Sequence, residues 1–431
     1  MLLGLQDFQG VDENNMESYY QISGIHGLPY KPWNGVASTS DWQETGGFGG
    51  YCTHSSILFA PWHRPYIALW EVSSLACLQP NPLMNHTNTP KQSLYTSVQK
   101  VAAKFPPGQL RDKYVAAAKD FRAPYWDWAS VPPANTPAFP TALSAPNLTV
   151  TAPDGTTKSI ANPLHSFTFH PMNPSPNDFP PRWSALPTTV RYPGASDQDT
   201  ITPIIANELS SLANNVGLLL LSYKNFDAFS YSQWDPNTSP GQYGSLEDVH
   251  NRIHDVTGGR GRGHMSSLDV SSYDPLFWMH LINVDRLWAI WQELNPSSFM
   301  SPRPAPYSTF STNGGAQGKI SLHIHHVPLH VAAFDHGLEF AVVGRAVLYH
   351  GDAAGLAERV GPRLLLCVLG ATAPAHEVDA FGRHGGMARG GQQTREQDCA
   401  DTCVQHHFYA LIVVFMSGAF ECPPIGSSRC G

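Results

Sequence analysis

The sequence predicts a mainly α-helical fold, with a four-helix bundle at its centre and long irregular loops between helices. Five stretches repeat apolar residues at helical spacing, namely 61–78, 94–119, 202–221, 245–256 and 273–294. Residues 129–200 are instead rich in Pro, Ser, Thr and Asn, which predicts long loops. Histidines lie on the apolar faces of the last two helices, and helix bundles commonly hold metals between such inward side chains.

The first three predicted helices are defined mainly by their apolar faces. On one face the stretch 61–78 carries Tyr66, Leu69, Trp70 and Cys77. The second stretch is interrupted at Pro106-Pro107, because proline lacks the backbone N–H that a helix interior requires. The third stretch ends in a run of four leucines, residues 218–221.

The last two predicted helices carry histidines on their apolar stripes. His250 and His254 are four residues apart and therefore lie one turn apart on the same side of 245–256. His280 lies on the buried stripe of 273–294, which opens with favourable N-terminal chemistry at Asp274-Pro275. A buried histidine needs partners for its ring nitrogens. Three hydrogen-bonded core histidines and three ligands of one metal ion are both compatible with this pattern.

A second group of histidines lies near the N-terminus. His54 follows a Gly-rich segment, His63 stands at the start of the first predicted helix, and His26 lies upstream of both. Imidazole-only ligand sets suit copper, zinc, iron or nickel. Carboxylates at ligand spacing are absent, which disfavours magnesium, calcium and carboxylate-bridged di-iron centres.

The overall composition excludes several other classes of protein. Of 431 residues, 42% are hydrophobic, and the net charge of −8 argues against a protein that binds nucleic-acid phosphates. No apolar stretch reaches the roughly 20 residues that span a bilayer, so no membrane partner is expected. The first residues lack the pattern of a secretory signal. Seven unevenly spaced cysteines do not form a disulfide framework. We therefore expect an intracellular protein.

Several motifs together resemble the tyrosinase family of type-3 dicopper polyphenol oxidases, and its fungal members in particular. The resemblance covers about residues 10–317. Its motifs are Gly24-Ile25-His26-Gly27-Leu28-Pro29-Tyr30, Tyr51-Cys52-Thr53-His54, Pro61-Trp62-His63-Arg64, Pro124-Tyr125-Trp126-Asp127-Trp128, Leu246-Glu247-Asp248-Val249-His250-Asn251-Arg252-Ile253-His254, Asp274-Pro275-Leu276-Phe277-Trp278-Met279-His280 and Asn283-Val284-Asp285-Arg286-Leu287-Trp288.

The resemblance implies a helical bundle that holds a dicopper centre, with O2 as co-substrate and small phenols as substrates. Two sets of three ligands are implied, His26, His54 and His63 for the first copper and His250, His254 and His280 for the second. By position Cys52 matches the cysteine that forms a thioether with the middle ligand of the first set, here His54. An ordinary buried thiol is the alternative.

The implied activity is that of a tyrosinase: ortho-hydroxylation of monophenols and oxidation of o-diphenols to o-quinones, the chemistry of melanin-type pigments. Glu247 and Asn251 lie one helical turn apart and match family residues implicated in holding a water that accepts the phenol proton. For Glu247, a surface-facing role at the helix start is the alternative. A catechol oxidase or o-aminophenol oxidase without monophenol activity, an oxygen carrier and an inactive remnant also remain open.

The resemblance ends abruptly near Gly318. All eleven tryptophans precede residue 292, and His, Gly and Ala become frequent in the last segment. We expect residues 1–317 to form the catalytic domain, without the N-terminal stretch that family members have. Residues 318–431 are expected to be a divergent segment that is not family sequence.

Overall fold

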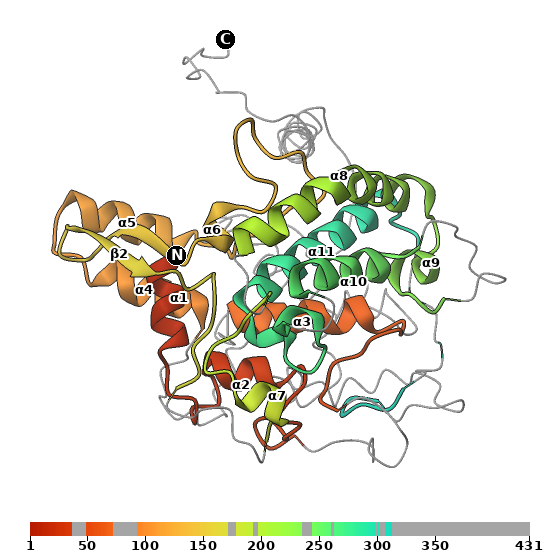
Figure 1. Ribbon diagram of the computed structural model, residues 1–431, viewed down its shortest axis with the longest axis horizontal. Coiled ribbons are helices and arrows are strands. Elements are labelled where there is room, and N and C mark those ends of the chain that lie inside the picture. The colour runs from red at the N-terminus through yellow and green to blue at the C-terminus, as the bar shows by residue number, and fades with distance from the viewer. Residues whose placement is uncertain are drawn as a thin grey trace, which may run out of the picture. The chain divides into compact units, whose positions relative to one another are not determined.

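The computed structural model describes residues 1–36, 49–71, 93–170, 178–192, 197–234, 244–259, 263–298, 300, 303 and 307–312 (Figure 1). Helices dominate the described residues, which confirms the predicted mainly α-helical class. The predicted boundary between residues 317 and 318 lies outside the described residues, as does Cys77.

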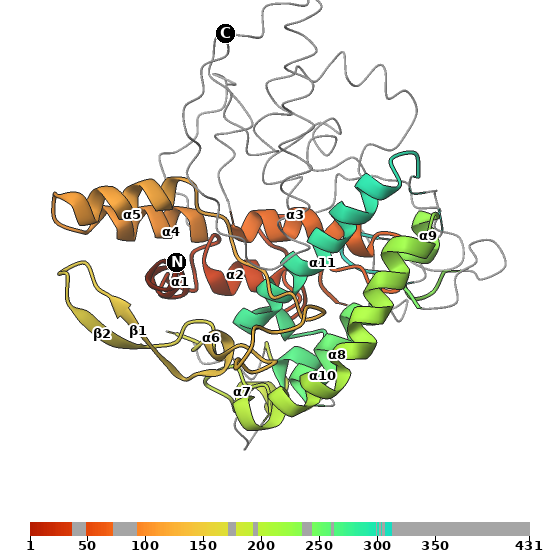
Figure 2. The same ribbon diagram turned by 90° about the horizontal axis from the view of Figure 1, so that it is seen from above.

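Four helices form the central bundle. They are α3 (Phe59–Glu71), α8 (Asp197–Ser222), α10 (Leu246–Gly258) and α11 (Pro275–Leu294). Helix α11 packs against each of the other three, and α10 also packs against α8 (Figure 2). The bundle therefore brings the histidine-bearing faces of α3, α10 and α11 together, while α8 closes the side of α10 and α11.

Local sequence sets the ends of α10 and α11. The Ser245 hydroxyl accepts from the Asp248 backbone N–H, and the Asp248 carboxylate accepts from the Ser245 N–H, so a capping box starts α10. Gly259 ends it at φ 71°, a left-handed conformation that favours glycine. The carboxylate of Asp274 accepts from the Leu276 N–H and Pro275 occupies the first turn, so α11 starts where the sequence predicts.

A buried ion pair fixes the start of α11. Arg191 Nη2 lies 2.9 Å from Asp274 Oδ1, and both side chains are almost fully buried. The same guanidinium donates to the carbonyls of Leu143 and Leu164, each at 2.7 Å. This network satisfies the two charges and ties the segment 143–164 to the helix that carries His280.

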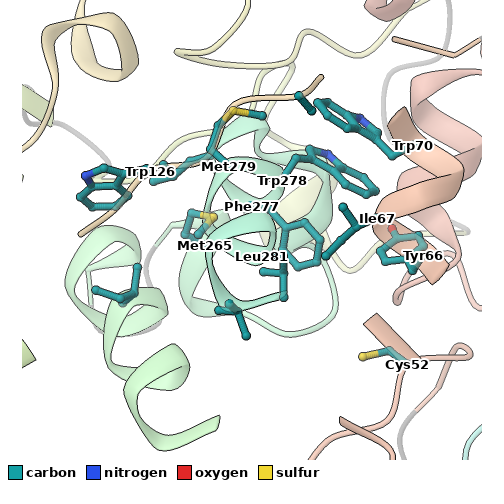
Figure 3. Close-up of a cluster of buried hydrophobic side chains, with 14 of the residues drawn as sticks. Cys52, Tyr66, Ile67, Trp70, Trp126, Met265, Phe277, Trp278, Met279 and Leu281 are labelled. Atoms are coloured by element: carbon teal, nitrogen blue, oxygen red, sulfur yellow. The ribbon is translucent and has the colours of Figure 1, made fainter. Parts of the chain in front are cut away.

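Aromatic side chains fill the interface between α3 and α11. Trp70 and Trp278 stack with ring centroids 4.8 Å apart and an interplanar angle of 6° (Figure 3). Phe277 points towards Ile67 and Tyr66 in the same cluster (Figure 3). On the other side of α3, Arg64 lies over the Trp288 ring at 3.6 Å and pairs with Asp285. The aromatic stack and the Arg64 contacts therefore hold α3 and α11 together at two separate places.

The remaining elements surround the bundle. Helices α1 (Leu2–Gln9), α4 (Leu94–Ala103) and α5 (Gln109–Lys119) pack together, and α2 (Tyr19–Gly24) lies against α3. Strands β1 (Asn147–Thr151) and β2 (Thr157–Ala161) form an antiparallel hairpin, paired from Asn147↔Ala161 to Thr151↔Thr157. The short elements are α6 (Thr141–Ser144), α7 (Pro181–Ser184), α9 (Phe226–Ser230), η2 (His264–Ser266) and η3 (Ser271–Tyr273).

Of three further sequence predictions, one is confirmed, one is covered in part by the described residues, and one is wrong in part. The interruption at Pro106-Pro107 is confirmed, since α4 ends at Ala103 and α5 begins at Gln109. The first predicted helix is described from residue 59 to 71. The prediction of loops throughout 129–200 is wrong, because this stretch contains the hairpin, α6, α7 and the start of α8. The Asp154-Gly155 turn, where the Asp154 carboxylate accepts from the Thr156 N–H, closes the hairpin.

The prediction that no apolar stretch is long enough to span a membrane needs a correction at helix α8. Within the described residues, Asp199–Ser222 is long and apolar enough, by length and composition alone, to cross a bilayer. Ile201, Ile205 and Leu212 of α8 are buried within the protein, but only 17% of the apolar window is; one such helix is weak evidence, because helices of soluble proteins also pass this test. This helix is therefore weak support for a membrane span.

Candidate metal centre

The second predicted ligand set comes together between α10 and α11. His250 and His254 lie one turn apart on α10, with their Nε2 atoms 3.0 Å apart. The His280 ring on α11 lies 5.0 Å from the His250 ring and 4.9 Å from the His254 ring, centroid to centroid. One nitrogen from each of the three rings falls within 4.8 Å of the others, close enough to share one metal ion.

The first set also comes together, but from less regular structure. His26 lies in the turn after α2, His54 in the loop before α3, and His63 on α3 itself. His26 and His63 have Nε2 atoms 3.5 Å apart, and the His54 ring centroid lies 5.3 Å from that of His26. In this set, therefore, only His63 comes from a helix, whereas all three histidines of the second set do.

The two sets face each other. Ring centroids of His54 and His250 are 6.1 Å apart, and those of His63 and His250 are 6.3 Å apart. Four of the six rings are buried, while His54 and His254 keep partial exposure. The arrangement is that of two adjacent three-nitrogen sites, with one ring of each set near solvent.

Backbone and amide oxygens orient four of the six rings. The Nδ1 atoms of His26, His63 and His254 lie 3.0, 2.7 and 2.6 Å from the carbonyls of Leu268, Phe59 and Met265. His250 Nδ1 lies 3.0 Å from the Asn251 side-chain oxygen. An oxygen acceptor fixes the ring proton on Nδ1, which leaves the Nε2 lone pair free for a metal.

His280 differs from these four rings. Its Nδ1 accepts a hydrogen bond from the Trp128 indole N–H at 3.0 Å, and indole only donates. The proton of neutral His280 therefore sits on Nε2, which is buried and has no hydrogen-bond partner among the described residues. A buried polar atom without a partner requires an explanation, and a metal ion bound at this nitrogen in place of its proton would provide one.

The pKa shifts of the six histidines suit metal binding. Burial, together with neighbouring histidines, lowers the pKa of His26, His54, His250 and His280 well below the usual value. Burial lowers the pKa of His63 to about 3 and that of His254 to about 4. All six rings are therefore neutral at pH 7, the state in which imidazole binds a metal.

Cys52 lies within the first set. Its sulfur is 2.9 Å from His54 Nδ1 and 3.7 Å from His54 Nε2, the two nitrogens that flank the ring carbon Cε1. It is also 3.1 Å from His26 Nε2. Burial and the nearby Glu247 charge raise the pKa of the thiol. Cys52 is thus placed against the edge of the His54 ring, as its predicted partnership requires.

Glu247 and Asn251 are placed differently from each other. Glu247 is 1% exposed, and its carboxylate accepts from the backbone N–H groups of Ser55 and Ser232. Burial raises its pKa to about 7. Asn251 is exposed and contacts His250. The alternative of a surface-facing Glu247 is therefore wrong, because the side chain turns inward towards the first ligand set.

Sequence reasoning missed Trp128, Ser55 and Ser232. Trp128 stood in a recognised motif, but nothing in its spacing showed that its indole would reach a ring 152 residues away. The two serines carry no pattern of their own, because their backbone N–H groups make the main contacts.

The chain is similar to fungal tyrosinases over most of its described length. Residues 16–294 match the common central domain of tyrosinase. Curated tyrosinases of Podospora anserina and Neurospora crassa are 62% and 64% identical, each over 74% of this chain. The chain spans about half the length of these relatives, 53% and 44% respectively.

A solved structure gives the same result. The structure of recombinant mushroom tyrosinase superposes on 73% of this chain and 52% of that chain, with a TM-score of 0.60 and 30% identity. The comparisons of sequence and of structure thus point to the same family as the two sets of histidines do. The chain belongs to the tyrosinase family.

Proposed function

We propose that this chain binds two copper ions and, with O2, hydroxylates monophenols at the ortho position and oxidises o-diphenols to o-quinones. The observation that carries the proposal is the pair of facing three-histidine sets, neutral and directed at each other. An all-imidazole set suits copper, zinc, iron or nickel, and membership of the tyrosinase family favours copper.

Copper, when bound, supplies the redox chemistry towards O2, and the protein supplies orientation and a dry site. Carbonyls of Phe59, Met265 and Leu268 hold three of the rings. Phe277 covers the centre from α11, with its ring centroid 5.0 Å from that of His26 and 6.0 Å from that of His254. These aromatic contacts exclude water from the buried side, while the partly exposed His54 and His254 leave an approach for a small phenol.

The phenol proton needs an acceptor, because phenol titrates near pKa 10. Glu247 is the carboxylate beside the centre, and its pKa of about 7 suits proton exchange at neutral pH. Both its oxygens already accept hydrogen bonds, yet a carboxylate has about four acceptor positions. We infer that Glu247, with Asn251, holds the water that takes the phenol proton.

Asn251 tests this proton path at matched copper content, because its side-chain oxygen also contacts the ligand His250. Asn251→Ala should lower monophenol turnover by roughly 10²-fold, the usual effect of losing a positioned proton path, and should affect catechol oxidation much less. The measurement is initial rates on tyrosine and on a catechol with matched copper content. Equal losses on both substrates would remove Asn251 from this role.

We propose that Cys52 and His54 form a thioether in the mature protein. A bond from the sulfur to Cε1 of His54 removes the thiol hydrogen and one ring hydrogen, two electrons in all, with O2 as the oxidant. Peptide mass spectrometry should find the peptide carrying both residues lighter by two hydrogens. If Cys52 reacts with an alkylating reagent after the copper-loaded protein is denatured, the bond is disproved.

The proposed activity is tested by loading the apo-protein with copper and adding tyrosine and then a catechol. Quinone formation from both substrates is expected. Turnover of the catechol alone would favour a catechol oxidase. Reversible O2 uptake without turnover would favour an oxygen carrier. Neither turnover nor O2 uptake would favour an inactive remnant.

A further inference from the structure

One carboxylate joins three segments beside the two ligand sets. Glu247 Oε1 accepts from the Ser55 backbone N–H at 2.6 Å. Its other oxygen accepts from the Ser232 backbone N–H at 2.8 Å and from the Ser232 hydroxyl at 3.0 Å. The side chain is 1% exposed, so these bonds form away from water, where a charged acceptor binds strongly.

The backbone that Glu247 holds is strained. Ser55 has φ 49°, in the left-handed region that residues with a Cβ atom rarely adopt outside Asn and Asp. Ser55 directly follows His54, and the chain enters α3, with His63, a few residues later. The conformation at Ser55 therefore sets the direction of the loop that carries a ligand of the first set. Such strain persists only where surrounding contacts over-determine it.

We propose that Glu247 is a positioning residue for the first ligand set. The bond that its carboxylate accepts from the Ser55 N–H holds Ser55 in the left-handed conformation and so keeps His54 directed at His26 and His63, while the bonds from Ser232 fix the carboxylate itself. Glu247 lies one turn before His250 on α10, so the same side chain ties the loop of the first set to the helix of the second. This role rests on the proposed copper centre and is separate from proton transfer.

The two roles of Glu247 respond differently to a second substitution. Glycine adopts a positive φ without steric cost, so Ser55→Gly removes the strain that the carboxylate opposes. It leaves unchanged whatever acid–base chemistry Glu247 performs. Ser55→Gly should therefore restore positioning in a Glu247→Gln protein and should not restore proton transfer.

The experiment compares wild type, Glu247→Gln, Ser55→Gly, the double variant and Glu208→Gln. Glu208 also contacts α10, through Arg252, but on the exposed side of the helix, so it is a matched control. Copper per chain is measured after dialysis against a mild chelator, and thermal unfolding is measured on each apo-protein.

We expect copper to fall from about two per chain to about one in Glu247→Gln, and to return to about two in the double variant. The control should keep about two. Glu247→Gln should lower the apo melting temperature, and Ser55→Gly should raise it by more in the Glu247→Gln protein than in wild type. Monophenol turnover should stay low in the double variant while catechol oxidation returns.

Unchanged copper in Glu247→Gln would overturn the positioning role, as would a loss that the folded double variant does not recover. The apo melting series needs no copper. If wild type bound no copper, the proposed function would fail while the melting series still decided whether Glu247 holds Ser55.

Discussion

At the scale of single residues, His280 is the exceptional ligand. Four of its partners present an unprotonated Nε2 because an oxygen holds their proton on Nδ1, whereas the Trp128 indole holds the His280 proton on Nε2. Binding of a metal at Nε2 must displace that proton. The indole N–H then opposes its return to Nδ1, so the second set should bind copper more weakly than its three nitrogens alone suggest.

Trp128→Phe tests this reading, since phenylalanine keeps a ring in place but has no donor. The affinity of the second set for copper should rise by about tenfold, equivalent to about 1.4 kcal/mol. The apo-protein should lose about 1–3 kcal/mol of stability from the missing bond and the smaller ring. Competition with a chelator of known affinity measures the first effect. A weaker site would show that the indole supports the metal-bound ring instead.

At the scale of helices, prediction from sequence succeeded where chemistry is local. The Asp274-Pro275 start of α11 and the four-residue spacing of His250 and His254 can be read from adjacent residues, and with them the placement of these two histidines and of His280. The hairpin at 147–161 was missed because its strands are short and mostly exposed, so they lack an apolar face. The links from Arg191 to Asp274 and from Glu247 to Ser55 join distant segments, which no local pattern reveals.

The anchor of α11 gives a prediction at this scale. Arg191→Met leaves Asp274 charged, buried and without its ion-pair partner, so stability should fall by about 3–5 kcal/mol. Adding Asp274→Asn should recover part of the loss, because asparagine still caps a helix and carries no charge. Urea unfolding of the apo-proteins measures both effects. A loss below about 1 kcal/mol in the single variant would show that the pair does not hold the helix.

At the scale of the whole molecule, the six histidines make the stability of the apo-protein depend on pH. Their pKa is lowered in the folded state, to about 3 for His63 and about 4 for His254, whereas unfolded histidine titrates near 6.5. Below pH 6.5 the unfolded chain therefore binds more protons, and stability falls as pH falls. Each histidine contributes up to about 1.4 kcal/mol per pH unit.

The buried Glu247 acts in the opposite direction, because its pKa is raised to about 7 in the folded state. Between about pH 7 and 4.5 the folded protein therefore binds this proton more tightly than the unfolded chain, and its contribution to stability rises as pH falls. One carboxyl cannot offset six imidazoles, so the net slope should be downward below pH 6.5. Melting temperatures of apo-protein between pH 7.5 and 5 measure it. A flat profile would mean that the rings are protonated and solvated in the folded apo-protein.

The unequal origin of the two histidine sets bears on the order in which the chain acquires its structure. His250 and His254 meet as soon as one turn of α10 forms, an event of low contact order. His26 and His63 meet only after the chain between them closes a loop, which costs entropy before any contact compensates for it. Refolding should therefore create the α10 pair first, so a metal ion present early would find two of the three nitrogens of the second set before any of the first set comes together.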